Sequence, residues 1–161
     1  MICSATILRR LAAADAPLLE EFFRALVASG GDALFHPHPF DATTAARICG
    51  HAAVDATAHD EYHAVIEDDR IVAYGMLRGW TEGYAVPSLG IAVLPECRRR
   101  GLAQRLMQHL HRVAADRGAT AVRLKVYRTN AAAIRLYEGL GYRLDGFTET
   151  ELLGRLPLHS S

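Results

Sequence analysis

The strongest constraint on the fold is a change of hydrophobic period across one short loop. Residues 84–93 are predicted as a β-strand that Pro95 ends. From residue 102 onward, apolar residues recur three and four positions apart, which predicts an amphipathic helix closing at Gly118. Residues 122–126 then alternate between apolar and basic side chains, which predicts another strand. A strand, a loop, a helix and a strand therefore follow one another.

The segments on either side predict a mixed sheet flanked by helices. Further helices are expected at residues 15–28, 41–53 and 130–139. Further strands are expected at residues 5–9, 62–67, 71–78, 142–147 and 149–153, with a hairpin turn at 68–70. This order predicts an α+β fold. The chain has 161 residues and no repeat or low-complexity linker, so we expect a single domain over residues 1–161.

Composition narrows the classes of partner and the compartment. Lys and Arg number 18 and equal Asp and Glu, which argues against general electrostatic binding to nucleic acid or to an anionic membrane. Three scattered cysteines lack the spacing of a disulfide framework or of a metal site, so we expect reduced thiols and no metal. The first ten residues contain no apolar stretch long enough for a signal peptide or a membrane span. A cytoplasmic protein is expected.

The loop after the strand at residues 84–93 has the composition of a phosphate-binding site. A helix N-terminus presents unpaired N–H groups and partial positive charge. Arg98, Arg99 and Arg100 stand directly before the helix, and Gly101 allows the backbone to approach a ligand closely. The alternative is a solvated basic face. Basic residues at this end of a helix oppose its dipole, however, which favours an anionic ligand.

A second element lies at residues 130–142. Asn130 and Tyr137 are seven residues apart, almost two turns, so they share one face of a helix. A phenol, with a pKa of about 10, is protonated at neutral pH and can donate to a leaving thiolate. The alternative roles are a helix cap for Asn130 and packing for Tyr137.

The two elements together resemble the GNAT family of N-acetyltransferases. The run Arg98 to Ala103 matches the family signature R/Q-x-x-G-x-G/A, with Ala103 in place of the commoner glycine. Residues 130–142 match N-x-x-A-x-x-x-Y-x-x-x-G-F/Y. The resemblance implies a GNAT-type mixed, mostly antiparallel central sheet flanked by helices. It also implies transfer of an acetyl group from acetyl-CoA to a primary amine by direct attack in a ternary complex.

The resemblance also assigns residues to the coenzyme. Main-chain amides of the loop would bind the pyrophosphate, and the strand would pair with the pantetheine arm through Ile91 and Val93. Asn130 would contact the arm, and the Tyr137 hydroxyl would lie near the thioester sulfur. The amides in question belong to Arg98, Arg99, Arg100, Gly101, Leu102 and Ala103. Homodimers are frequent in this family.

Three assignments around the reacting atoms are hypotheses. A free N–H in an irregular stretch of residues 89–93 would stabilise the carbonyl oxygen, and Gly90 would permit a bulge there. Glu82 leads as the general base, with His36 and His38 as alternatives. Cys97, beside three arginines, offers a competing covalent route, but its place in the loop lies away from the thioester.

The acceptor amine is not identified by the sequence. Phe35, Trp80 and Tyr84 are candidates for the walls of an acceptor cleft and equally for the core. A protein N-terminus, a lysine, a polyamine, an amino sugar and an antibiotic stay open, although the lack of excess negative charge disfavours a polycation. The alternative function is a non-catalytic acyl-CoA-binding or sensing domain, which needs the loop but not the proton donor Tyr137.

Overall fold

A seven-stranded mixed sheet forms the centre of the computed structural model, which describes residues 5–51 and 59–159. The strands are β1 (Ile7–Arg10), β2 (Glu61–Glu67), β3 (Arg70–Arg78), β4 (Ser88–Val93), β5 (Ala121–Tyr127), β6 (Arg143–Gly146) and β7 (Glu151–Pro157). The helices are α1 (Ala16–Ala28), α2 (Ala42–Gly50), α3 (Leu102–Asp116) and α4 (Ala131–Gly139). The strand order is β1-β2-β3-β4-β5-β7-β6.

The sheet is antiparallel except at its centre. All neighbouring strands pair antiparallel apart from β4 and β5, which run parallel. The mixed, mostly antiparallel sheet expected from the family resemblance is therefore confirmed.

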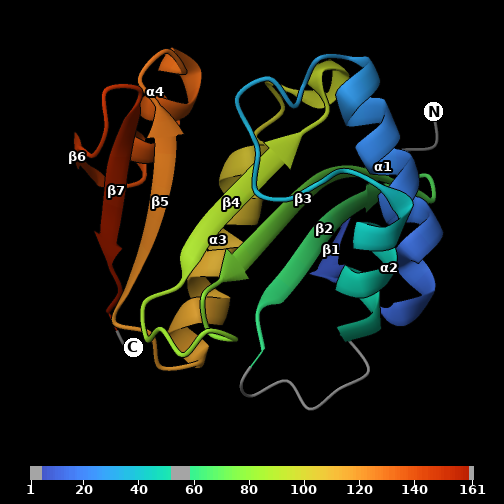
Figure 1. Ribbon diagram of the computed structural model, residues 1–161, viewed down its shortest axis with the longest axis horizontal. Helices are drawn as coiled ribbons and strands as arrows, with labels where there is room; N and C mark the ends of the chain where they lie inside the picture. The colour runs from blue at the N-terminus through green and yellow to red at the C-terminus, as the bar shows by residue number, and fades with distance from the viewer. Residues whose placement is uncertain (1–4, 52–58, 160–161) are drawn as a thin grey trace.

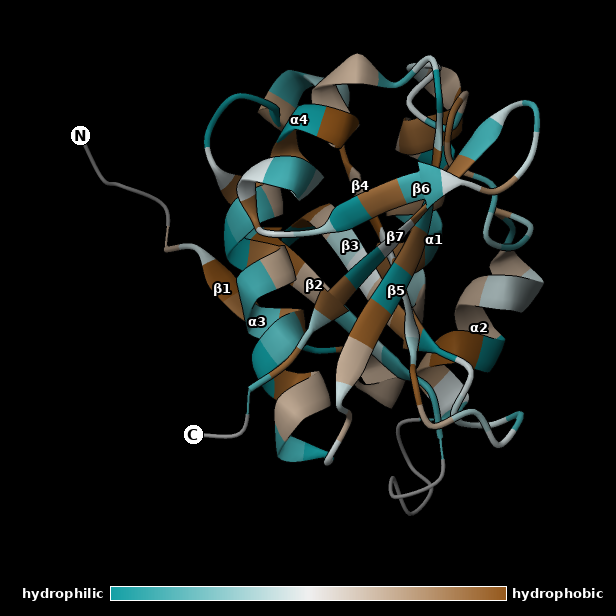
Figure 2. Cartoon of the chain, turned by 90° about the vertical axis from the view of Figure 1, so that its left-hand side faces the viewer, coloured by the Kyte–Doolittle hydropathy of each residue, from teal (hydrophilic) through white to brown (hydrophobic). Residues whose placement is uncertain are grey.

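Helices cover both faces of the sheet. Helices α1 and α2 lie on one face, and α3 and α4 lie on the other (Figures 1 and 2). A Cβ atom on Gly75 of β3 would lie 2.8 Å from Leu110 of α3, so this small residue lets α3 pack closely on the strand. A Cβ atom on Gly90 of β4 would instead lie 3.3 Å from Phe35, in the loop between α1 and α2. Residues of β4 therefore alternate between the α3 face and the face of the α1–α2 loop.

Most predicted elements are present, with shifted ends. The predicted turn between β2 and β3 is confirmed, since Asp68 and Asp69 have φ of 51° and 56°, as a two-residue hairpin turn requires. Gly118 ends α3 as predicted, with φ of 85° and its N–H donating to Ala115 O. Asp41 caps α2 by accepting a 2.8 Å hydrogen bond from the Thr44 N–H. The helix was expected to continue to residue 53, but residues 52 and 53 lie outside the described part of the chain.

Two predicted strand boundaries were wrong. The strand expected from residue 84 begins at Ser88, because Tyr84 closes a turn in which its N–H donates to Gly79 O at 2.9 Å. The last strand was expected to end at residue 153 but continues to Pro157, because it pairs with the whole of β5 from Tyr127 to Ala121. Pairing with β5 therefore extends β7 beyond the residue at which the local sequence pattern predicted its end.

Within the described residues, no helix has the length and apolar character needed to cross a bilayer.

Candidate active site

Strands β4 and β5 separate from a single point of contact. Their register contains one pair, Ser88 with Arg123, and the Arg123 N–H donates to Pro87 O at 3.0 Å. Beyond this pair the strands diverge toward their C-terminal ends (Figure 1). This separation of the two strands is called the β4–β5 gap below. A sheet that opens in this way leaves main-chain groups without a strand partner.

The groups that face the gap belong to Ile91 and Val93. The Leu94 N–H donates to Val72 O in β3, so Leu94, Ala92 and Gly90 direct their polar groups toward β3. Alternation then directs the N–H groups of Ile91 and Val93 toward β5, which no longer pairs at this level. The two residues expected to pair with an extended ligand thus have N–H groups available for it.

The loop at the open end of the gap has the geometry of an anion site. Gly101 is the N-cap of α3 with a left-handed φ of 76°, and Arg99 is also left-handed, at 63°. The first helical hydrogen bond runs from the Arg105 N–H to Gly101 O, so the preceding N–H groups have no helical acceptor. A Cβ atom placed on Gly101 would meet no atom within 4 Å, so its surroundings are open. These residues fit a diphosphate group.

Two arginine side chains hold this loop in place. Arg100 donates to both carboxylate oxygens of Glu67 at the end of β2, at 2.6 and 3.0 Å. The Arg98 Nε atom donates to Val93 O at 3.3 Å. The side chain of Arg100 therefore anchors the loop, and the available N–H groups, rather than this guanidinium, are suited to the ligand.

Asn130 and Tyr137 of the second element lie on α4. Asn130 is the N-cap of the helix, and its side chain accepts from the Ala133 N–H at 3.3 Å. The Tyr137 ring is buried, and burial raises the pKa of its hydroxyl to about 12. With this raised pKa the hydroxyl keeps its proton at neutral pH and can donate it.

A histidine that the sequence analysis missed supports the same element. His111 of α3 has its Nε2 atom 2.7 Å from the Tyr142 hydroxyl, and the Tyr142 ring lies 5.9 Å from that of Tyr137. The Tyr142 N–H also donates to Tyr137 O at 3.0 Å. His111 was missed because one histidine among the polar positions of a helix carries no signal of its partner 31 residues away.

The bulge expected in β4 is not present. The register between β3 and β4 is continuous over residues 88–93, and the bulge in this part of the sheet lies between β2 and β3, at Val65 and Ile66. Gly90 instead makes room for Phe35 and Met76, whose atoms would lie 3.3 and 3.2 Å from a Cβ atom there. Free N–H groups arise in β4 because β5 diverges, and no irregular backbone is needed.

The candidate general bases occupy different surroundings. Glu82 is exposed in the turn at residues 79–84, next to Tyr84, whose ring lies 5.4 Å from the Arg123 guanidinium at the closed end of the gap. His36 is exposed and lies against Tyr127 of β5, with Nε2 3.0 Å from Ala33 O. His38 has both ring nitrogens engaged, with Pro39 O at 2.8 Å and the Tyr74 hydroxyl at 3.0 Å. His38 therefore has no free nitrogen with which to accept a proton.

The remaining candidates are placed as follows. Phe35 lies over β4 beside the gap, whereas Trp80 packs under the Arg117 guanidinium, 3.7 Å from its ring centre, at the far end of α3. Tyr84 is 53% exposed. Cys97 is buried in the core, facing away from solvent, which disfavours it as a nucleophile. Cys3 lies outside the described residues.

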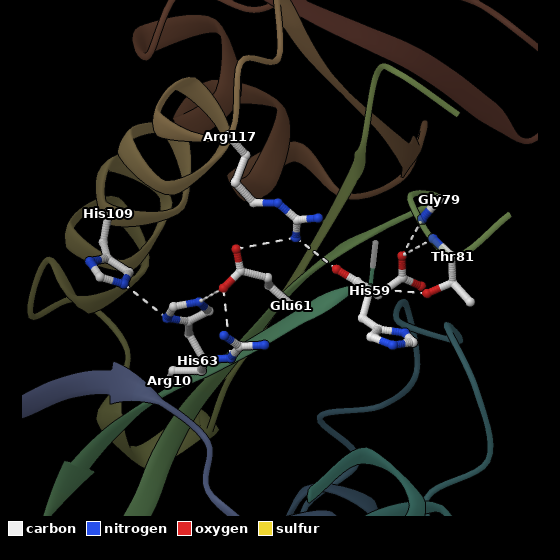
Figure 3. A network of polar contacts seen from close by, with 9 residues as sticks. Arg10, His59, Glu61, His63, Gly79, Thr81, His109 and Arg117 are labelled. Carbon is white, nitrogen blue, oxygen red and sulfur yellow. Dashed lines mark hydrogen bonds and ion pairs between the residues drawn. The ribbon is translucent and has the colours of Figure 1, made fainter. Parts of the chain in front are cut away.

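A second polar cluster lies between β2 and α3, with Arg10 of β1 beside it (Figure 3). The buried Glu61 carboxylate contacts His63 Nε2 at 3.2 Å, Arg117 at 3.3 Å and Arg10 at 3.8 Å. His63 Nδ1 lies 2.9 Å from His109 Nε2. Burial raises the pKa of Glu61, but His63 and the two arginines outweigh it and lower the pKa overall. Because each charge in the cluster is paired, we assign it a structural role.

A cavity of about 430 Å³ beside α1 also lies away from the gap. It is lined by Glu20, Arg24, Val27, Ala28, Phe40, Asp41 and Ala42. Its charged groups are already engaged, since Arg24 pairs with Glu20 at 2.8 Å and Asp41 caps α2. Neither the phosphate loop nor α4 contributes to it, so we place the candidate site in the gap. Among the described residues, no group of three His, Cys, Asp or Glu side chains is arranged to bind a metal ion.

Comparison with known proteins decides the family. The model of the acetyltransferase (GNAT) family matches residues 20–142, which include β4, the phosphate loop and α4. The chain belongs to the GNAT family. Its match to the ribosomal protein bS18 alanine N-acetyltransferase of Salmonella typhimurium has 39% identity over 75 residues, which is 47% of this chain and 49% of that protein. The chain thus spans about half the length of the curated relatives that it matches.

Solved GNAT structures share the fold over nearly the whole chain. The GNAT domain of an S. lividans protein named PAT superposes with a TM-score of 0.79 at 18% identity, covering 96% of this chain and 97% of that one. The PaiA N-acetyltransferase of Thermoplasma acidophilum, solved in complex with coenzyme A, has a TM-score of 0.78 at 13% identity, covering 95% and 99%. At these identities the likeness establishes the fold alone.

Proposed function

We propose that this GNAT-family chain transfers an acetyl group from acetyl-CoA to a primary amine by direct attack in a ternary complex. The observation that carries the proposal is the β4–β5 gap, where the N–H groups of Ile91 and Val93 lack strand partners and lead to the open N-terminus of α3. An extended ligand ending in a diphosphate would satisfy both sets of N–H groups. The coenzyme A in the PaiA structure and the acetyltransferase names of the relatives support this ligand.

The chain's own residues then have defined tasks. Bound acetyl-CoA supplies the acyl thioester. The N–H groups of residues 98–103 would bind its diphosphate, and those of Ile91 and Val93 would hold the arm extended. A main-chain N–H of β4 at the gap would also donate to the carbonyl oxygen as that oxygen gains negative charge.

Proton movement completes the step. The acceptor nitrogen forms a bond to the acyl carbon while the carbon–sulfur bond breaks. Tyr137 would donate its hydroxyl proton to the leaving sulfur, and its raised pKa means that the hydroxyl is protonated at neutral pH. Glu82 is our proposed base for the amine proton, because its turn borders the closed end of the gap through Tyr84 and Arg123. His36, across the gap next to Tyr127, is the second candidate.

A thiol-release assay over a panel of amines tests this function. Purified protein with acetyl-CoA should release coenzyme A only when an acceptor is present, and mass spectrometry should find one acetyl group on that acceptor. Saturating coenzyme A should stabilise the protein, by about 2.7 kcal/mol at a hundredfold excess over its Kd. Stabilisation without turnover on any amine would support the alternative, a non-catalytic acyl-CoA-binding domain. The absence of both stabilisation and turnover would contradict both functions.

The other expectations from the sequence stay predictions. They are a cytoplasmic location, a single domain over the whole chain, and a homodimer. The Salmonella relative is named a ribosomal protein bS18 alanine N-acetyltransferase, which makes a protein or peptide amine one acceptor to test first.

A further inference from the structure

The three C-terminal strands bring three arginines side by side. Arg123 of β5 is directly opposite Arg155 of β7, and Arg155 is directly opposite Arg143 of β6. Residues directly opposite in antiparallel strands have their side chains on the same face of a sheet. The three guanidinium groups therefore form one row across the strands, about 10 Å from end to end at the usual strand spacing. Lys125, two residues along β5, is on the same face. These four residues are called the basic row.

The face that carries the basic row is open. Arg143, Arg155 and Lys125 are exposed and Arg123 is half-buried, while the alternate residues Leu124 and Gly154 are buried on the other face. Figure 2 shows these three strands from the β6 edge, with hydrophilic and hydrophobic residues alternating along β5 and β7. The row is thus a surface and not part of the core.

Like charges in this arrangement oppose folding, and little in the chain offsets them. Like charges directly opposite in a sheet are destabilising. Within the described residues, Arg123, Lys125 and Arg155 have no ion pair, and Arg143 has only Asp145 at 3.7 Å, with both side chains largely exposed. An ion pair between two exposed side chains contributes little to the stability of the fold.

Other carboxylates lie further from the row. Glu151 is on the same face and opposite Tyr127, which is two residues and about 7 Å along β5 from Lys125 and about 13 Å from Arg123. The row therefore keeps an excess of positive charge in a chain whose formal net charge is zero.

Two exposed aromatic rings support the basic side chains. The Arg123 guanidinium lies 5.4 Å from the Tyr84 ring, and the Lys125 ammonium lies 4.7 Å from the Phe147 ring. Tyr84 is 53% exposed and Phe147 49%. Rigid rings beneath cations hold these charges in fixed positions while leaving their outer sides to a partner.

The row begins at the closed end of the β4–β5 gap. Arg123 forms the single β4–β5 pair with Ser88, and Ser88 and Gly90 share the face on which Phe35 and the α1–α2 loop lie. This is the face that α3 does not occupy. The phosphate loop, by contrast, begins after Val93, about 17 Å along β4 from Ser88 at the usual rise per residue. The basic row is therefore separate from the coenzyme's phosphates and adjacent to the place where an acceptor amine would react.

On the basis of the proposed function, we propose that the basic row binds the acceptor. The acceptor is an acidic peptide whose amine enters the gap. A flat, open row about 10 Å long suits consecutive side chains of a peptide better than it suits a small molecule, which would be enclosed by a pocket. Carboxylates on the residues following the amine would pair with the arginines. A basic acceptor would be repelled.

Matched peptides test this proposal. Three peptides with the same free N-terminus carry Glu, Gln or Lys at the positions that follow, and initial rates with acetyl-CoA give kcat/KM for each. We expect the Glu peptide to exceed the Gln peptide about fivefold to tenfold at low salt, with the advantage falling as salt rises. The double variant Arg143→Glu/Arg155→Glu should remove or invert this preference, so that the ratio of kcat/KM for the Glu peptide to kcat/KM for the Gln peptide falls to one or below.

The control and the outcomes separate the claims. Arg112→Glu makes one Arg-to-Glu replacement on the exposed side of α3, on the other face of the sheet. This variant should keep the preference for the Glu peptide. Equal rates on all three peptides would overturn the acidic acceptor and leave the acetyltransferase in place. A free acidic amino acid acetylated as well as the peptide would overturn the peptide part. No transfer to any peptide or small amine would overturn both the inference and the proposed function.

Discussion

The Nε2 atom of His111 lies 2.7 Å from the hydroxyl oxygen of Tyr142 and joins α3 to the residue that ends the second family element. Tyr142 also lies beside Tyr137, with the two ring centroids 5.9 Å apart. A contact between α3 and the segment that follows α4 thus supports the surroundings of the proposed proton donor. Burial, with a smaller contribution from Arg112, lowers the pKa of His111 to about 4.

The burial of His111 predicts a loss of stability in acid. In the unfolded chain His111 takes up a proton near pH 6.5, whereas in the folded protein it does so only near pH 4. Its contribution is therefore complete above pH 6.5 and is lost as the pH falls from 6.5 to 4. Discounted for partial exposure, the loss is about 2 kcal/mol in the free energy of unfolding. Denaturant titrations across this range should show a flatter dependence for His111→Gln, and an identical slope would contradict the assignment.

Tyr137→Phe tests the proton donor. The ring and its packing are kept while the hydroxyl is removed, so coenzyme A binding should be unchanged. We expect kcat to fall at least tenfold, since a positioned acid typically contributes a hundredfold or more. Tyr62→Phe, another buried tyrosine on the far side of the sheet, is the control and should retain its rate. A Tyr137→Phe protein with full kcat would remove this residue from the mechanism.

Gly101→Ala tests the phosphate loop against a matched glycine. Gly101 and Gly118 stand at opposite ends of α3, with φ of 76° and 85°, and neither has an atom within 4 Å of an added Cβ. Alanine at either position should cost about 1–2 kcal/mol of stability because of the left-handed backbone. Only Gly101→Ala should weaken coenzyme A binding, measured by calorimetry, because only there does the methyl group enter the proposed ligand site. Equal affinities for the two variants would contradict the site.

Arg155→Glu should make the protein more stable. Arg155 lies between Arg123 and Arg143, so a carboxylate there replaces two like-charge neighbours by two opposite-charge ones. We expect a gain of about 0.5–1 kcal/mol, seen as a higher Tm at low salt that diminishes at high salt. Arg155→Gln should give a smaller gain. A stability gain together with a loss of preference for acidic acceptors would show that the row is kept for binding.

The general base can be distinguished by pH. In Glu82→Gln, the rate at limiting acceptor should fall most at neutral pH and recover as the pH rises and the amine loses its own proton. His36→Gln is the parallel variant, since His36 is the other candidate beside the gap. The variant whose deficit disappears at high pH identifies the base. Full activity of Glu82→Gln at every pH would exclude Glu82.

Local sequence determined the elements and the residues of the candidate coenzyme site. The helical spacing after residue 102 and the Asn130–Tyr137 spacing are signals carried within a few turns of chain, and both segments are helical as expected. Gly101 was expected to open the loop before the helix, and the structure adds that its φ is left-handed. They could be predicted because backbone conformation and helix capping depend mainly on near neighbours. The resemblance to the family motifs added the expected arrangement of these elements, a mixed and mostly antiparallel sheet flanked by helices.

Tertiary structure alone decided how the site opens and what surrounds it. The gap depends on β4 and β5 pairing only at Ser88 and Arg123, 35 residues apart, which no local pattern encodes. The same holds for the three arginines of the basic row, since their neighbours are set by strand register. A shift of one residue would place them on the buried face. Side chains from distant segments meet through packing and pairing, so their partners are fixed only when the sheet forms.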